Sequence, residues 1–149
     1  MKLHSFLALA TATLFSASIA ACSSDNVSHD ANTLPSKAHE ILSQNFNSAI
    51  SLVNEEKDFG KVSEYEVTLS DGTEVTFTSS GEWKSVDTPN NLSVPSGMVP
   101  TAISRYVREK HAGALIVGIE KEKNGFDVEL SNGIDMKFDQ SGNFVSYDK

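Results

Sequence analysis

Stretches of strict alternation between apolar and polar residues follow segments with helical periodicity along this chain. Residues 64–78 and 125–139 alternate on either side of a turn, as in strands that bury one face. Before them, apolar residues recur every three to four positions in 34–46 and 99–107. The pattern predicts amphipathic helices followed by antiparallel strands, with one apolar and one solvated side of the sheet.

These stretches belong to an internal repeat. Residues 65–87 align without gaps with residues 126–148 at an offset of 61, and nine of the 23 aligned pairs are identical. A further strand precedes each alternating stretch, at about 50–57 and 115–123, so each copy is expected to hold one helix and four strands. One copy buries too little surface to be stable alone. The expected fold is α+β: two α-β-β-β-β repeats forming one roughly eight-stranded antiparallel sheet, with two helices on one face.

Turn residues define the register of the expected hairpins. A three-residue loop at 70–72 pairs Leu69 with Thr73 and keeps the apolar side chains on one side, whereas a two-residue loop would mix the two sides. Gly72 then takes the left-handed position of a common hairpin type. The same loop is expected at 131–133, and a tight turn at Asn124-Gly125. The first copy is expected to have a longer loop there, through residues 58–63.

The first residues predict an export signal. Lys2 precedes an uncharged apolar run at 6–15 that is too short to span a membrane as a helix and is typical of a secretory signal. The run leads to Ile19-Ala20-Ala21-Cys22, which resembles the bacterial lipobox and implies cleavage before Cys22 and lipidation of that cysteine. More than one acyl chain is needed for a stable anchor, and a diacyl or triacyl cysteine meets this requirement. The alternative is ordinary cleavage after Ala20, which would leave a free thiol.

The chain is therefore expected to consist of a signal peptide, a tether and one domain. Residues 1–21 would be the lipoprotein signal peptide. Residues 22–33 are predicted to be a flexible tether, because they contain one aliphatic residue larger than alanine and cannot bury enough apolar surface. The domain would consist of repeat 34–87, linker 88–98 and repeat 99–148.

A family resemblance covers most of the expected mature chain, about 34–148. Its elements are the tandem helices that begin at Leu-Pro or Val-Pro, the segment EKEKNGFDVELSNG at 120–133, and Phe-Asp-x-x-Gly-x-Phe at 138–144. Together they resemble the PepSY-like family, also called β-lactamase-inhibitor-like, whose members are secreted or lipid-anchored bacterial proteins. The shared positions are fold-making glycines and apolar residues. The resemblance thus implies an architecture and an envelope location, and it transfers no catalytic or ligand residues.

Charge and composition exclude several function classes. Twelve basic and twenty acidic residues give a net charge of −8, and loss of Lys2 with the signal gives −9, so no binding to nucleic acid is expected. One cysteine cannot form an internal disulfide or a zinc cluster. The histidines lack ligand spacing, and the paired carboxylates alternate with lysines as on a solvated sheet face. We expect no enzyme, no metal site and no cofactor.

The polar side of the sheet is the predicted partner-binding surface. Alternation places Val86, Val145 and Tyr147 on it, where polar residues are expected, and exposed tyrosine is typical of interface anchors; a twist of the last strands or a terminus could instead cover them. We expect a binding module for an unidentified envelope or secreted protein, with inhibition of a secreted enzyme as one form. The alternative is binding of a small ligand or divalent cation on the acidic face. The candidate partner-binding residues are Glu74, Thr76, Lys84, Val86, Lys137, Val145 and Tyr147.

Overall fold

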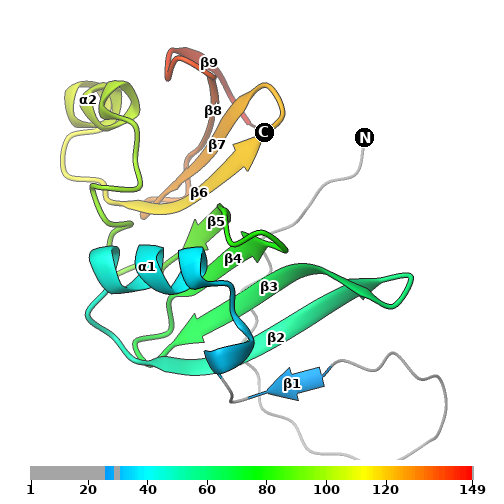
Figure 1. The fold of residues 1–149 in the computed structure, drawn as a ribbon. Helices are drawn as coiled ribbons and strands as arrows, with labels where there is room; N and C mark the ends of the chain where they lie inside the picture. Colours follow the sequence, from blue (N-terminus) through cyan, green and yellow to red (C-terminus); the bar gives the residue numbers. More distant parts are fainter. Residues whose placement is uncertain (1–25, 29–30, 149) are drawn as a thin grey trace, which may run out of the picture.

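A computed structural model describes residues 26–28 and 31–148 of the protein, and within these residues one antiparallel sheet of nine strands carries the fold (Figure 1). The strands lie in the sheet in chain order, so each strand is paired with its neighbours along the chain. The elements are β1 (Asn26–Ser28), η1 (Ala31–Thr33), α1 (Ser36–Asn45), β2 (Ile50–Asp58), β3 (Lys61–Leu69), β4 (Glu74–Thr78), β5 (Trp83–Asp87), α2 (Thr101–Lys110), β6 (Ile116–Glu122), β7 (Gly125–Leu130), β8 (Asp135–Asp139) and β9 (Phe144–Tyr147).

Both α-helices begin directly after a proline. Pro35 and Pro100 have φ angles of −56° and −53°, close to the helical value. The carbonyl oxygen of Pro35 accepts hydrogen bonds from the backbone N–H groups of Ala38 and His39, and that of Pro100 accepts one from Ser104. Proline fits this place because it lacks an amide proton that the start of a helix would leave unpaired. The predicted helices are confirmed, and each is ten residues long.

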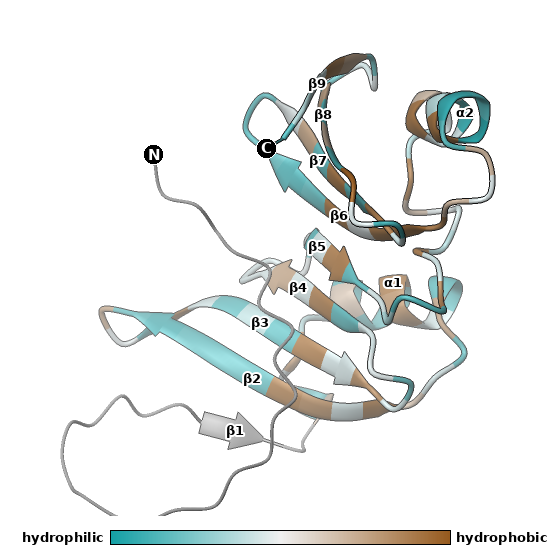
Figure 2. Cartoon of the chain, turned by 180° about the vertical axis from the view of Figure 1, so that it is seen from behind, coloured by the Kyte–Doolittle hydropathy of each residue, from teal (hydrophilic) through white to brown (hydrophobic). Residues whose placement is uncertain are grey.

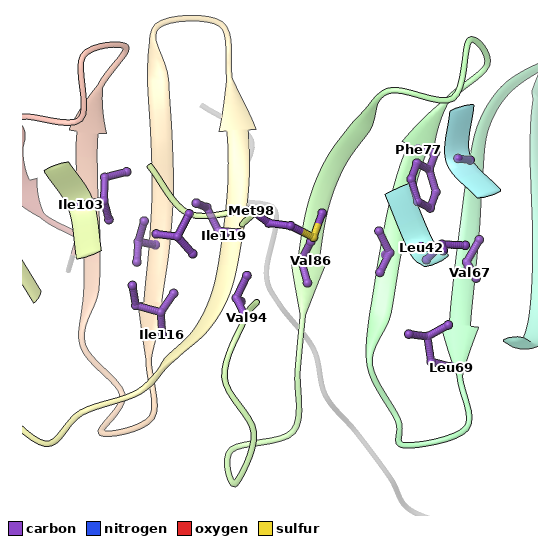
Figure 3. Packing of buried hydrophobic residues seen from close by; sticks show 14 of the residues in the cluster. Leu42, Val67, Leu69, Phe77, Val86, Val94, Met98, Ile103, Ile116 and Ile119 are labelled. Atoms are coloured by element: carbon purple, nitrogen blue, oxygen red, sulfur yellow. The ribbon is translucent and has the colours of Figure 1, made fainter. Parts of the chain in front are cut away.

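Both helices pack on the same side of the sheet and share one hydrophobic core. α1 covers the strands of the first half and α2 those of the second half (Figure 1). Where the halves meet, β5 pairs with β6, and Val86 lies opposite Ile119. Figure 3 shows Met98 and Val94 of the intervening segment beside this pair. All four residues belong to one buried cluster, so the sheet is continuous in packing as well as in hydrogen bonding.

The predicted register of the three-residue hairpins is confirmed. Tyr65 pairs with Phe77 and Val67 with Val75, all on the helix side. The N–H of Leu69 donates to the carbonyl oxygen of Thr73 at 2.8 Å, which closes the loop at 70–72. The loop at 131–133 is closed in the same way, by a 2.9 Å hydrogen bond across it.

The first hairpin of each half differs from the prediction. In the second half, Glu122 pairs with Gly125, so the turn consists of residues 123–124 and Gly125 already belongs to β7. In the first half, Asp58 pairs with Lys61, so the predicted longer loop is wrong. A two-residue turn replaces it, and a register shift between Glu56 and Lys57 absorbs the extra residue.

The N-terminal region is partly ordered against the sheet. Asn26 pairs with Glu55 and Ser28 with Val53, so β1 covers the outer edge of β2, and η1 follows at 31–33. The prediction of a flexible tether is therefore wrong for these residues. The signal peptide and Cys22 lie outside the described residues. In the described part, no helix is long and apolar enough to cross a membrane.

Candidate functional site

The side of the sheet that faces away from α1 and α2, here called the outer face, is the predicted binding surface. Figure 2 shows hydrophobic and hydrophilic bands alternating along the strands, as expected when every second side chain enters the core. The helices lie on the other side, and no helix of the described residues covers the outer face (Figures 1 and 2).

A β-bulge in β5 changes the side to which its last residues point. Trp83 pairs with Phe77, but Val86 pairs with Val75, so three steps along β5 match two steps along β4 and Lys84 is the extra residue. A bulge of this kind shifts the alternation by one position. Val86 is consequently fully buried in the core. Its prediction as a partner-binding residue of the outer face is wrong.

An equivalent bulge at Val145 in β9 moves Tyr147 to the helix side. Tyr147 pairs with Met136, which is buried in the core. Its hydroxyl lies 3.3 Å from Nε2 of His111 at the end of α2, and its ring centroid lies 4.9 Å from that of Phe144. Tyr147 is half exposed. It belongs to an aromatic cluster at the edge of the sheet and not to the outer face, so its predicted place is also wrong.

The other candidate residues share the outer face without forming one patch. Thr76 and Lys137 lie in the same row across the sheet, four strands apart. At a strand spacing of about 4.8 Å, about 19 Å separates them. Glu74 is exposed, whereas Lys84 is half-buried. Val145, in the last strand β9, is 61% exposed. These residues line a broad surface rather than a pocket.

Both lysines of this set are held by carboxylates. Nζ of Lys84 lies 2.7 Å from Oε1 of Glu64. Nζ of Lys137 lies 3.1 Å from carboxylate oxygens of Asp127 and of Asp148. These hydrogen bonds raise the pKa of both lysines above the usual value. The outer face therefore has little free positive charge to offer a partner.

The centre of the outer face carries a row of carboxylates. Glu74 pairs with Asp87, and Glu129 pairs with Asp135, while Gly118 is the register partner of both Asp87 and Glu129. We call Glu74, Asp87, Glu129 and Asp135 the acidic row. It crosses five adjacent strands, β4 to β8, with one position that has no side chain.

Gly118 leaves room for the two carboxylates beside it. A Cβ atom at this position would lie 3.1 Å from Oδ1 of Asp87 and 3.2 Å from Cβ of Glu129. Both side chains therefore lean over the bare backbone of β6, and a larger residue would push them apart. The glycine brings two like charges close together on a half-buried surface.

The electrostatic consequence is largest at Asp87. Burial, followed by repulsion from Glu129, Glu74, Glu120 and Glu66, raises the pKa of Asp87 to about 7. Burial, together with Asp135, also raises the pKa of Glu129. A carboxyl group with such a pKa changes its charge near neutral pH, and clusters of this kind are candidates for functional sites. The acidic row is suited to bind positively charged groups.

Unbroken alternation along the sequence assigns Asp87 to the helix side of the sheet. Asp87 was therefore not among the predicted residues of the outer face. Trp83 and Val86 are both apolar and three positions apart, a spacing that an unbroken strand does not explain. The same spacing recurs between Phe144 and Tyr147. This repeated irregularity is the signal from which the bulges, and hence the position of Asp87 on the outer face, could have been inferred.

The histidines and acids do not form a metal centre in the described part of the chain. No group of three or more His, Cys, Asp or Glu side chains is arranged there as metal ligands. Nε2 of His39 lies 2.7 Å from the carbonyl oxygen of Ala31, which ties α1 to η1. His111 contacts Tyr147 as described above. Both histidines have structural contacts.

Comparison with known proteins identifies the family. Residues 63–146, more than half of the chain, match a family model described as "Putative beta-lactamase-inhibitor-like, PepSY-like". The chain belongs to the PepSY-like family. This description names no catalytic activity. Among curated proteins, none matches this PepSY-like chain.

Solved structures of similar proteins come from Bacteroides. A "putative periplasmic protein of unknown function" from Bacteroides vulgatus is 37% identical, with a TM-score of 0.78, over 84% of this chain and 99% of that chain. A "putative calcium-regulated periplasmic protein" from Bacteroides thetaiotaomicron is 34% identical, with a TM-score of 0.73, over 79% and 92%. A second periplasmic protein from B. vulgatus, also described as putative, is 29% identical, with a TM-score of 0.74, over 85% and 99%. These descriptions support an exported, cell-envelope location for the PepSY-like chain.

Proposed function

We propose that this PepSY-like protein is a non-enzymatic, lipid-anchored protein of the cell envelope that binds another exported protein through its outer face. The observation that carries the proposal is the acidic row, which crosses a sheet face that no described helix covers. A partner with lysine or arginine side chains on its surface fits this face, because the row is acidic and the chain as a whole has a net charge of −8.

The gap at Gly118 gives the interaction a centre. An arginine laid over the bare backbone could pair with Asp87 on one side and Glu129 on the other, in the planar arrangement that guanidinium groups favour. Such a cation would remove the repulsion between the two carboxylates and lower the pKa of Asp87. Binding should consequently be tighter at pH 8 than at pH 6, and it should weaken with added salt because the row is partly exposed.

The test compares two matched pairs of charge reversals. Glu74→Lys with Glu129→Lys changes the acidic row, whereas Glu40→Lys with Glu109→Lys makes the same change in charge on the helix side. Partners captured by the wild-type domain from an envelope extract are identified by mass spectrometry, and their affinities for all three proteins are then measured. The row variant should lose most of the binding and the helix-side variant little. Equal losses for both would reject the outer face as the binding surface.

The family description makes an exported enzyme the first class of partner to examine. For any enzyme found among the captured proteins, activity is measured with increasing amounts of the wild-type domain. Inhibition that the row variant fails to produce would identify the protein as an inhibitor. Binding without inhibition would leave an escort or scaffold role.

The lipid anchor at Cys22 is part of the same proposal. It is supported by the lipobox-like Ile19-Ala20-Ala21-Cys22 and by the periplasmic description of the relatives. Intact-mass measurement of the protein from its native membrane should show an acylated N-terminal cysteine, and Cys22→Ser should move the protein to the soluble envelope fraction. An unmodified thiol would instead support cleavage after Ala20.

Divalent-cation binding is the second candidate function. Asp87 and Glu129 beside Gly118 favour it, as does the description of the B. thetaiotaomicron relative as calcium-regulated. Calcium prefers carboxylate oxygens, so millimolar calcium should raise the melting temperature, more at pH 8 than at pH 6. Asp87→Asn should reduce this rise, and no rise with wild type at either pH would reject the candidate.

The repeated architecture is also a proposal. Apart from β1 and η1, the two halves have the same order of elements, and their bulges at Lys84 and Val145 are separated by the offset of 61 found in the sequence. We infer that they are copies of one α-β-β-β-β unit that became dependent on each other. Each half expressed alone should be largely unfolded, because Val86 and Ile119 would lose each other as packing partners.

A further inference from the structure

The β2–β3 hairpin extends beyond the core as a two-stranded ribbon with an apolar tip. Residues 56–61 are all exposed, and apart from Phe59 and the adjacent Gly60 they are charged. Figure 2 shows the ribbon as largely hydrophilic, with a hydrophobic end. The ribbon thus carries one large apolar side chain away from the core and into the surroundings.

Phe59 is an unusual residue for this position. Its φ of +51° and the φ of +79° at Gly60 give a turn with two left-handed residues, where asparagine or aspartate normally precedes glycine. Phenylalanine is strained in this conformation, and Phe59 is fully exposed, so no packing within the described protein offsets the strain. Strain combined with a solvent-exposed aromatic side chain indicates a contact made outside the fold.

The register of β1 relates this tip to the predicted anchor. Asn26 pairs with Glu55, and β1 is antiparallel to β2, so the chain before Asn26 starts from the side of the sheet edge that leads to the tip. Figure 1 shows the beginning of β1 on the side of the hairpin end. Cys22 precedes Asn26 by four residues, and Phe59 follows Glu55 by four residues. Both can therefore reach about 13 Å from the same pair.

We propose that Phe59 inserts into the interfacial region of the lipid bilayer and serves as a second membrane contact beside the lipid at Cys22. This inference rests on the proposed lipid anchor, because a single aromatic side chain does not hold a protein on a membrane. The anchor would keep Asn26 near the bilayer, and the tip would then fix the orientation of the ribbon. The outer face would be held at a defined angle to the membrane.

The charges around the tip allow Phe59 to approach the membrane surface. Residues 56–61 include two acidic and two basic residues, so this segment has no net charge to be repelled by an anionic surface. Nζ of Lys57 lies 3.1 Å from Oε2 of Glu55. The contact should depend on the aromatic side chain and only weakly on the charge of the lipid.

The test attaches the chain from Cys22 onwards to vesicles through its single cysteine. The thiol is coupled to maleimide-bearing lipid in phosphatidylethanolamine–phosphatidylglycerol vesicles, which supplies an anchor whether or not cells acylate Cys22. Tryptophan reports insertion in Phe59→Trp, and Val145→Trp is the control for an exposed apolar side chain elsewhere. The signal of Trp83 is subtracted with the parent chain.

Anchored Phe59→Trp should emit at shorter wavelength than in solution and should be quenched by brominated lipid, whereas Val145→Trp should show neither effect.

Phe59→Asn supplies a second readout, because asparagine suits the left-handed turn and should raise the melting temperature. Trypsin should cleave at Lys57 and Lys61 more slowly in the anchored wild type than in anchored Phe59→Asn. Unquenched Phe59→Trp on vesicles that carry coupled protein would overturn the proposal, as would equal cleavage of wild type and Phe59→Asn. Absence of acylation in cells would affect only the proposed anchor.

Discussion

Asp87 owes its altered chemistry to its neighbours in the sheet. An aspartate at the end of a strand is ordinarily exposed and ionised at neutral pH. Here the bulge at Lys84 turns Asp87 to the outer face, Gly118 lets Glu129 come close to it, and Glu74 lies opposite. The protein thus keeps a carboxylate where partial burial and repulsion disfavour its charge, as is common at functional sites.

Asp87→Asn should stabilise the protein, and more so at pH 8 than at pH 5. The pKa of Asp87 is about 7 in the folded protein and near its usual 3.8 in the unfolded chain, so the folded state binds more protons between these values. The free energy of unfolding of the wild type therefore falls as the pH rises from about 4 to about 7. At pH 8 the variant should gain on the order of 1–2 kcal/mol, a figure reduced for partial solvent screening.

Urea denaturation at the two pH values measures this effect. Asp58→Asn is the matched control, because Asp58 is an aspartate at the exposed end of the hairpin. A gain for Asp87→Asn that is the same at pH 5 and pH 8 would contradict the altered ionisation of Asp87.

In each half, a glycine in a hairpin turn allows the turn to pack closely against the start of the helix. Gly81 in the β4–β5 turn has a φ of +84° and lies against the start of α1, and Gly142 in the β8–β9 turn has a φ of +80° and lies against the start of α2. At each place the absence of a side chain lets a helix end and a hairpin approach closely. The position of the helix over its strands depends on this contact as well as on the core.

Gly81→Ala should be clearly more destabilising than Gly133→Ala. Both glycines have similar φ angles, +84° and +79°, so the left-handed backbone costs about 1 kcal/mol in either variant. At Gly81 a Cβ atom would also lie 2.9 Å from Cβ of Pro35 and 3.0 Å from the backbone nitrogen of Ala38, whereas at Gly133 nothing lies within 4 Å. We expect about 2 kcal/mol of additional loss at Gly81 from this crowding. Equal losses in denaturant titrations would show that α1 moves aside without cost.

The helices and strands were predicted from the sequence, whereas the face of the sheet to which some side chains point was not. Alternation and turn glycines determine the strands and the register around 70–72, because both are local properties of the chain. A bulge changes the side of the sheet to which Val86 and Tyr147 point without changing their strand, and its only trace in the sequence is the spacing of three between apolar residues. Alternation assumes an unbroken strand, so the acidic row, which needs the bulge and the gap at Gly118, was missed.

The two halves share one hydrophobic core. Val86 of β5 and Ile119 of β6 are fully buried partners at the junction, and Met98 of the intervening segment packs beside them (Figure 3). The segment between the halves is thus part of the core and not merely a linker. Loss of packing at the junction should destabilise both halves.

Ile119→Ala should destabilise both halves together, by about 2–5 kcal/mol, because it leaves a cavity between them. Trp83 fluorescence reports β5 of the first half, at the junction, where Nζ of Lys121 lies 3.6 Å from the ring centroid. Near-ultraviolet circular dichroism of the stacked Tyr106 and Phe144 rings, 4.8 Å apart, reports the second half. The two signals should keep a common midpoint in denaturant, shifted equally from the wild type. Separate midpoints would show that the halves unfold independently.

The strand order also bears on how such a chain can acquire its shape during export. Because each described strand pairs with its predecessor, a polypeptide that emerges from a translocation pore amino end first can complete one pairing after another as new residues arrive. The junction of β5 with β6 must wait only for the segment that includes α2. Little of the backbone is then left exposed at any moment to aggregation or to proteases outside the cytoplasm.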